Sequence, residues 1–243
     1  MLFKIKLADV TIGINSIFEE VFNMCRDYIC DEPEAFSVSI TQSDIDFERD
    51  KSNKEAAFEG RPIVAFSDAY LETLAVYRKI AVGLLDYNVL LMHGSAVCAD
   101  GKAYLFTAPS GVGKTTHSRL WLENIEGSFI INGDKPLIRI ADDGCIIYGT
   151  PWSGKENINK NTSALLKAVC FLERSAENKI FEVKFSEVIP ALFQQVYRPE
   201  NPEAMLKTMN LIKKFGAATR FYRLGCNMLP DAAITAYEGM RND

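Results

Sequence analysis

The spacing of hydrophobic positions changes several times along the chain and predicts a mixture of strands and helices. Residues 2–14 and 36–41 alternate between apolar and polar side chains and are rich in β-branched residues, which is typical of strands. Between them, residues 16–30 place apolar side chains near one helical face. Residues 42–61 are strongly charged, so we expect a surface loop or a polar hairpin there, and the main boundary of the chain.

From Ser67 onward the pattern predicts an α/β core. A mostly apolar helix is expected from Ser67 to about Asp86, and an acidic turn at Asp142 and Asp143 indicates a hairpin. Short apolar runs are typical of buried strands. The further expected elements are strands 89–92, 95–98, 103–107, 129–134, 138–141, 145–148, 180–184 and 219–224, and helices 116–125, 161–171, 186–197, 203–214 and 231–241.

Length and composition fit one large globular domain with a small appendage. The chain has 243 residues, of which 48% are hydrophobic and 24% charged, so it can bury a core. We expect a small α+β subdomain over residues 1–66 and the main domain over residues 67–243. The net charge of −5 argues against a general nucleic-acid binder.

Cysteine and histidine content predicts the compartment. None of the six cysteines forms a CxxC pair, and with two histidines the chain lacks the pattern of a zinc site or a disulfide framework. The N-terminus does not resemble a secretory signal, and the longest apolar stretch, Ile80–Met92, is too short to span a membrane. We therefore expect a cytoplasmic protein without membrane partners, and its oligomeric state stays open.

The strongest chemical signal is the glycine-rich segment APSGVGKTT, residues 108–116. Backbone N–H groups in such a loop can surround phosphate oxygens, and a helix start beneath the loop favours negative charge. Lys114 can reach the β- and γ-phosphates, and the Thr115 hydroxyl can ligate Mg²⁺. A strand is expected before the segment and a helix after it, as a phosphate loop requires. The nucleotide-binding residues are predicted to be Ser110, Gly111, Val112, Gly113, Lys114, Thr115 and Thr116.

An acid follows the next expected strand. Asp134 ends the run FIINGD and can either hold Mg²⁺ or accept a proton from an attacking hydroxyl; an Asx turn before Pro136 is the structural alternative. His93 lies at the end of another apolar run and is a second candidate for proton transfer, although a lone histidine is more often structural.

Two further segments carry candidate contacts to the transferred phosphate or the acceptor. The segment GTPWSGK combines Thr150, Ser153 and Lys155 and is either a loop over the phosphates or a turn capped by a packed tryptophan. Arg174 follows an apolar run and can pair with phosphate or with neighbouring glutamates.

Taken together, HGSAV, APSGVGKTT, INGDK and GTPWSGK resemble the bacterial HPr serine kinase/phosphorylase group, whose phosphate-loop fold is shared with ATP-dependent phosphoenolpyruvate carboxykinases. The resemblance covers roughly residues 67–175. It implies a kinase-like core on a mixed, curved sheet, and it strengthens the catalytic prediction for His93. The loop departs from the general phosphate-loop pattern at Ala108, which stands where that pattern has its first glycine. The chain departs from the family at Gly133-Asp134, where the family has two acids, and in its 66 N-terminal residues, where the family has a larger domain.

The resemblance and the residues together predict an ATP- and Mg²⁺-dependent phosphotransferase. Asp134, His93 and Lys114 are the predicted catalytic residues, and Thr115 and Asp134 the predicted metal ligands. The expected acceptor is a serine or threonine hydroxyl of a protein or small peptide. A small-molecule kinase or carboxykinase-type enzyme and a non-catalytic nucleotide sensor remain alternatives. The sequence leaves open the acceptor's identity, ATP against GTP, and the reverse phosphorylase reaction.

Overall fold

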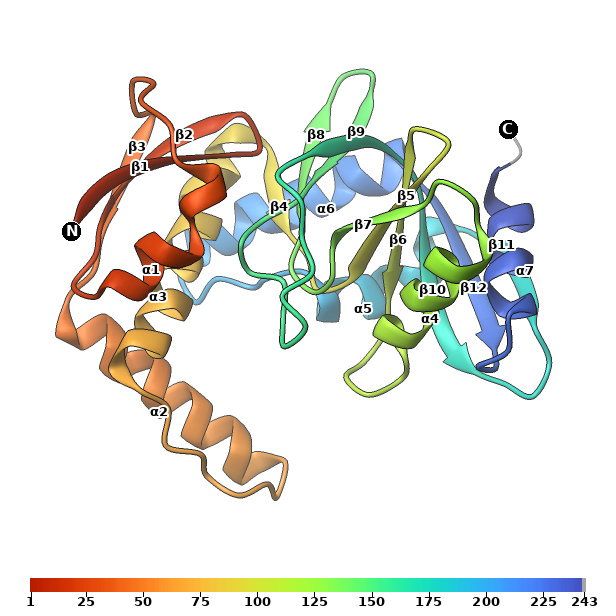
Figure 1. Cartoon of the computed structure of the whole chain (residues 1–243), viewed down its shortest axis with the longest axis horizontal. Coiled ribbons are helices and arrows are strands. Elements are labelled where there is room, and N and C mark those ends of the chain that lie inside the picture. Colours follow the sequence, from red (N-terminus) through yellow and green to blue (C-terminus); the bar gives the residue numbers. More distant parts are fainter. Residues whose placement is uncertain (242–243) are drawn as a thin grey trace. The chain divides into compact units, whose positions relative to one another are not determined.

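The computed structural model describes residues 1–241 and divides the chain into two compact units, one spanning Met1–Leu84 and the other beginning at Leu85 (Figure 1). The sequence placed the boundary between residues 66 and 67 instead. The division lies later because the helix after Ser67 packs against strands and helices of the first unit. Each unit is described by itself below.

In the first unit, the strands of the described chain form a three-stranded sheet with the order β1-β2-β3. The expected strand over residues 2–14 is a hairpin, because Ala8 and Asp9 take left-handed conformations with φ of 48° and 58°. The expected helix over 16–30 is shorter. The elements are β1 (Leu2–Leu7), β2 (Val10–Asn15), α1 (Glu19–Met24), the 3₁₀ helix η1 (Arg26–Tyr28), β3 (Phe36–Ser39), α2 (Gln42–Phe58) and α3 (Asp68–Leu84).

The expectation of a loop or hairpin over residues 42–61 is wrong, since this segment contains the helix α2. It has no continuous apolar stripe, and charged side chains make many of its contacts. The Asp44 carboxylate accepts the Thr41 backbone N–H at 3.0 Å and so caps the helix start. On the side facing α3, Arg78 pairs with Glu48 at 2.5 Å and Lys79 with Asp44 at 2.7 Å. A helix held by ion pairs to its neighbour lacks the hydrophobic period that sequence analysis detects.

In the second unit, nine strands of the described residues form one curled, mixed sheet. The strand order is β4-β8-β9-β10-β6-β5-β7, and β12 joins β10 to β11. The elements are the 3₁₀ helix η2 (Leu85–Tyr87), β4 (Val89–Leu91), β5 (Ser95–Ala99), β6 (Lys102–Thr107), α4 (Lys114–Asn124), β7 (Phe129–Asn132), β8 (Leu137–Ala141), β9 (Gly144–Tyr148), β10 (Ser163–Arg174), β11 (Lys179–Val183), α5 (Phe185–Gln195), α6 (Pro202–Ala218), β12 (Arg220–Cys226) and α7 (Asp231–Arg241).

The expected helix over residues 161–171 is wrong, because this segment forms most of the long strand β10. Parallel partners, β6 and β12, pair with its middle and second half. A central strand between such neighbours is covered on both faces and so becomes a continuous apolar run. That run, Ala168–Leu172, does not alternate and therefore does not distinguish a buried strand from a helix.

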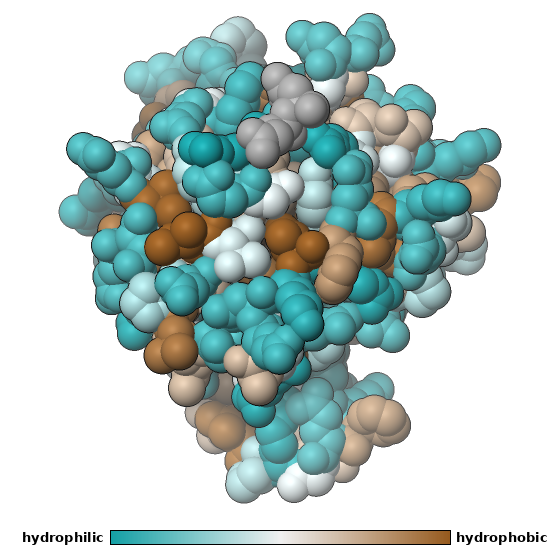
Figure 2. Space-filling model, turned by 90° about the vertical axis from the view of Figure 1, so that its right-hand side faces the viewer, coloured by the Kyte–Doolittle hydropathy of each residue, from teal (hydrophilic) through white to brown (hydrophobic). Residues whose placement is uncertain are grey.

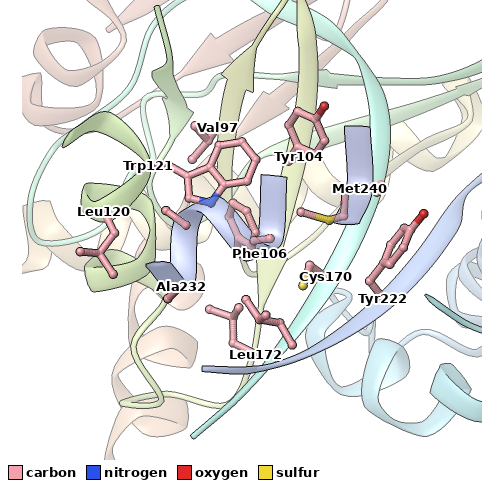
Figure 3. Close-up of a cluster of buried hydrophobic side chains, with 14 of the residues drawn as sticks. Val97, Tyr104, Phe106, Leu120, Trp121, Cys170, Leu172, Tyr222, Ala232 and Met240 are labelled. Carbon is pink, nitrogen blue, oxygen red and sulfur yellow. The ribbon is translucent and has the colours of Figure 1, made fainter. Parts of the chain in front are cut away.

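Helices cover both faces of this sheet. On one face α4 and α7 pack on β5, β6, β10 and β12, and Trp121 lies against Phe106 with ring centroids 5.1 Å apart (Figure 3). On the other face α5 and α6 pack on the strands, and Phe215 meets Phe221 at 5.8 Å. The neighbouring residue Tyr222 belongs to the first cluster, so successive residues of β12 serve opposite layers. Strand β6 of this sheet ends at Thr107, and the chain then leads through residues 108–113 into α4.

The surface is more hydrophilic than these buried clusters. On the face that Figure 2 shows, hydrophilic side chains predominate and hydrophobic ones form small groups between them. Within residues 1–241, the structure has no helix that combines the length and the hydrophobicity needed to cross a bilayer.

A buried histidine in α4 predicts acid sensitivity. Burial lowers the pKa of His117 to about 4, and its Nε2 accepts the Trp121 Nε1–H at 3.1 Å. The unfolded ring takes up a proton below about pH 6.5, so the free energy of unfolding falls as the pH drops from 6.5 towards 4. Between pH 7 and pH 5 we expect wild type to lose about 2 kcal/mol more than His117→Gln, which keeps an acceptor for Trp121. Urea unfolding at both pH values measures this difference, and equal losses would contradict it.

Candidate functional site

The predicted phosphate loop connects the buried strand β6 to the start of α4. Gly113 precedes the helix with φ of 126°, a conformation that side-chain-bearing residues rarely adopt. The first helical hydrogen bond runs from the His117 N–H to the Gly113 carbonyl at 2.9 Å. The N–H groups of Lys114, Thr115 and Thr116 therefore have no acceptor inside the helix, as at any helix start, and can serve an anion.

Lys114 folds back over this loop. Its Nζ donates to the carbonyl of Ala108 at 2.9 Å and to that of Pro109 at 3.4 Å. Burial lowers the pKa of Lys114, and the charge of Asp134 opposes this shift only in part. The ammonium group thus lies where it can exchange loop carbonyls for phosphate oxygens.

Asp134 and His93 come together at the edge of the sheet where β6 leads into the loop, and the hydroxyl of Thr107, the last residue of β6, donates to the His93 carbonyl at 2.8 Å. The Gly94 N–H donates to the Asp134 carbonyl at 2.8 Å, and His93 Nε2 lies 3.3 Å from Asp134 Oδ1. Their side chains are 27% and 37% exposed, so both are accessible to a ligand. Burial raises the pKa of Asp134, but the hydrogen bond with His93 and the charges of Lys135, His93 and Lys114 outweigh burial and lower it overall. The carboxylate is therefore ionised near neutral pH.

Asn132, which the sequence analysis missed, holds the backbone of the turn that carries Asp134. Its side chain is fully buried, and its Oδ1 accepts the N–H groups of Asp134 at 2.9 Å and Lys135 at 2.7 Å. Its Nδ2 donates to the carbonyl and the hydroxyl of Thr150, each at 3.0 Å. One amide thus joins the end of β7 to the following acidic turn and to the loop after β9. An asparagine ending an apolar strand before Gly133 was the available signal for such an Asx turn.

The segment after β9 lies against Asp134. A Cβ atom at Gly154 would be 2.9 Å from the Cβ and 3.4 Å from the Oδ2 of Asp134, so the backbone passes directly beside the acid. Thr150 and Ser153 are buried, and their hydroxyls bind inside the protein: Thr150 donates to the Lys135 carbonyl at 2.9 Å, and Ser153 accepts from Asn159 at 2.9 Å. Both hydroxyls thus stabilise the loop from within, and a contact of either residue with a ligand stays a prediction.

The two predicted cations differ in their surroundings. Arg174 ends β10, and its Nη2 donates to the Gly111 carbonyl of the phosphate loop at 2.7 Å. Lys155 is exposed, and the described residues show no contact between it and the other candidates. The neighbouring Glu156 pairs with Arg119 of α4 at 2.7 Å and ties this end of the loop to the helix.

A second missed residue, Gln195, reaches His93 from the end of α5. Its backbone carbonyl accepts the His93 N–H at 2.7 Å, and its Oε1 lies 3.1 Å from His93 Nδ1. Nothing in the sequence connects two residues that lie so far apart along the chain. The site thus brings together the phosphate loop, Lys114, Arg174 and the pair of His93 and Asp134.

Comparisons with known proteins give a distant likeness. No family model and no curated protein matches the chain. Among solved structures, the chain is similar to the Hpr(Ser) kinase/phosphatase from Coxiella burnetii, with a TM-score of 0.36 and 9% identity over 63% of this chain and 99% of that chain. This is a fold-level similarity, and the function proposed below rests on contacts within this chain.

Removing the Asn132 amide tests its positioning role. Asn132→Ala leaves two N–H groups and the Thr150 carbonyl without their partner in a buried place, so we expect unfolding to require about 3 kcal/mol less. The control Asn124→Ala removes a single bond to the Leu120 carbonyl in α4 and should cost less than about 1 kcal/mol. Denaturant unfolding measures the free energy of unfolding of both variants. Equal losses would contradict the positioning role of Asn132.

Proposed function

We propose that this protein transfers the γ-phosphoryl group of ATP to a hydroxyl group. The main support is that two groups of residues lie at the same edge of the sheet: the predicted phosphate loop at a helix start with Lys114, and the accessible pair of His93 and Asp134. The Thr107 hydroxyl just before the loop donates to the His93 carbonyl at 2.8 Å. The electrostatic influence of Asp134 and Lys114 on each other's pKa supports their belonging to one site. Phosphoryl transfer needs this combination of cations for the phosphates and an acid–base group for the acceptor.

In the proposed function, the loop and its neighbouring cations bind the phosphates of ATP. The N–H groups of residues 113–116 and the Lys114 ammonium would hold the β- and γ-phosphates, and Arg174, already bonded to the loop, would add a second cation. The exposed Thr115 hydroxyl fits Mg²⁺, which prefers oxygen and usually takes few protein ligands beside phosphate oxygens and water. When bound there, Mg²⁺ would neutralise charge on the phosphates.

In the proposed function, Asp134 acts on the hydroxyl group that accepts the phosphoryl group. The sequence left two roles open for this acid, metal ligand and proton acceptor, and its bond with His93 together with the closeness of Gly154 favours the second. In the proposed reaction the acceptor hydroxyl gives its proton to the His93–Asp134 pair while its oxygen bonds to the γ-phosphorus and ADP leaves. The proposed acceptor is a serine or threonine of a protein or small peptide.

Nucleotide binding is tested by thermal unfolding. Mg·ATP at millimolar concentration should raise the melting temperature, since a ligand that binds the folded state stabilises it. Lys114→Ala should remove most of this rise, because it removes the cation over the loop. The matched control Lys102→Ala, an exposed lysine at the other end of β6, should keep the rise. Wild type without any rise would contradict the proposed function.

Transfer is tested at Asp134. Asp134→Asn keeps the shape and removes the charge, so we expect Mg·ATP to bind within about tenfold while ATP turnover falls by about 10²-fold or more, as for the loss of one positioned acid–base group. Turnover is measured by ADP release with water alone and with serine- or threonine-containing peptides. Asp143→Asn, in the turn between β8 and β9, is the control and should not change turnover. Unchanged turnover in Asp134→Asn would remove this acid from the mechanism and favour a nucleotide sensor.

A further inference from the structure

The carboxyl ends of three parallel strands lie side by side at the edge of the sheet that carries the predicted phosphate loop (Figure 1). In the register of these strands, Thr107 of β6 is paired with Phe171 of β10, and Arg174 of β10 with Cys226 of β12. Neighbouring strands are about 5 Å apart, so β12 lies about 10 Å across the sheet from β6. Ligands of α/β sheets bind beyond the carboxyl ends of the strands. A ligand held by the predicted phosphate loop can therefore extend along this edge towards the loop after β12.

The loop after β12 exposes two adjacent apolar side chains at this edge. Met228 is 77% exposed and Leu229 is 61% exposed. The backbone beneath them is held in place, because the Asn227 N–H donates to Asn178 Oδ1 at 2.9 Å and the Leu229 N–H donates to Asn227 Oδ1 at 3.0 Å. Two apolar side chains on a fixed turn form a small surface that is stabilised when another apolar group covers it.

The charges along the edge separate the part of a ligand that carries phosphate from the part that does not. Lys114 and Arg174 place cations beside the loop after β6, and Arg174 donates to the Gly111 carbonyl at 2.7 Å. Beyond β12 the charge is reversed, because the first turn of α7 holds Asp231 and no basic residue. A carboxylate repels phosphate. Phosphates are thus favoured at the ends of β6 and β10, and an uncharged apolar group at the end of β12.

The strand order also gives the direction in which a nucleotide would lie. Strands β5 and β7 are on the opposite side of β6 from β10 and β12, and Asp134 follows β7. A nucleotide whose γ-phosphate is directed towards Asp134 therefore extends its nucleoside past Arg174 towards β12. We infer that Met228 and Leu229 form an apolar contact surface for the purine ring of the nucleotide.

This inference deepens the proposed function and rests on it, because it names the residues that would contact the nucleoside of bound ATP. Contact with the face of a purine ring needs apolar surface and no charge. Met228 and Leu229 would add to the affinity for ATP without touching its terminal phosphates or the acceptor hydroxyl. Their loss should therefore weaken nucleotide binding and leave the binding of phosphate groups intact.

A comparison of the nucleotide with its phosphates alone tests the inference. We expect Met228→Ser combined with Leu229→Ser to raise the dissociation constant of Mg·ATP about tenfold, because the purine ring loses its apolar cover. The dissociation constant of Mg·tripolyphosphate, which has no base, should stay unchanged. Calorimetric titration of the full chain measures both constants. The matched control combines Leu206→Ser with Met209→Ser on α6, where these side chains are 60% and 54% exposed, and should change neither constant.

The wild-type side chain gives a second test, which does not depend on the folding of the double variant. In protein with ¹³C-labelled methionine methyl groups, Met228→Leu identifies the Met228 signal by its loss. A purine ring that lies on this methyl group should shift the signal when Mg·ATP binds, because an aromatic ring changes the magnetic field close to its face. Mg·tripolyphosphate should leave the signal where it is.

The outcomes distinguish this inference from the proposed function. An unchanged dissociation constant of Mg·ATP in the double variant, or a Met228 signal that responds to ATP no more than to tripolyphosphate, overturns the inference and leaves the proposed function standing. An equal rise of both dissociation constants in the double variant would indicate damage to the phosphate loop and would also overturn it. A wild type that binds neither ligand contradicts the proposed function, and the inference with it.

Discussion

The site depends on one buried amide, that of Asn132. Its two polar atoms bind different segments. The oxygen accepts the backbone N–H groups of the turn that carries Asp134, and the nitrogen donates to Thr150 in the loop after β9. A buried amide with all its partners present has a single favourable orientation, because rotating it would face donors with donors and acceptors with acceptors. The backbone position of Asp134 is therefore set by hydrogen bonds inside the protein.

The predicted phosphate loop and the pair of His93 and Asp134 are held in place by different parts of the fold. The phosphate loop rests on the core between α4, α7 and the central strands, where Trp121 packs against Phe106 (Figure 3). The pair of His93 and Asp134 lies beyond the ends of β4 and β7 and is held by backbone bonds, from the His93 N–H to the Gln195 carbonyl and from the Gly94 N–H to the Asp134 carbonyl. Arg174 extends from β10 to the loop carbonyl of Gly111 and so anchors the loop to the sheet as well. Side chains on separate strands and helices are thereby brought together by one rigid sheet.

Sequence patterns predicted the elements whose conformation depends on residues close together in the chain. The strand and helix around the phosphate loop were predictable, because glycines and the helix start carry their own backbone preferences. The helix α2 was not, because many of its contacts are ion pairs such as Arg78 with Glu48, which sequence periodicity does not detect. Strand β10 was taken for a helix because its burial on both faces removes alternation. Asn132 and Gln195 were missed because their partners are set by tertiary contacts: the bridge between Met92 and Val196 joins segments that no motif connects.

The close passage of Gly154 beside Asp134 has an entropic consequence. A flexible carboxylate would lose rotational freedom each time it engaged a substrate, and that loss would weaken every binding event. Here the backbone at Gly154 already occupies the space on one side of the side chain, and His93 occupies another. The side chain gives up this freedom once, when the chain folds, so a substrate that bound at this carboxylate would need no further ordering of it.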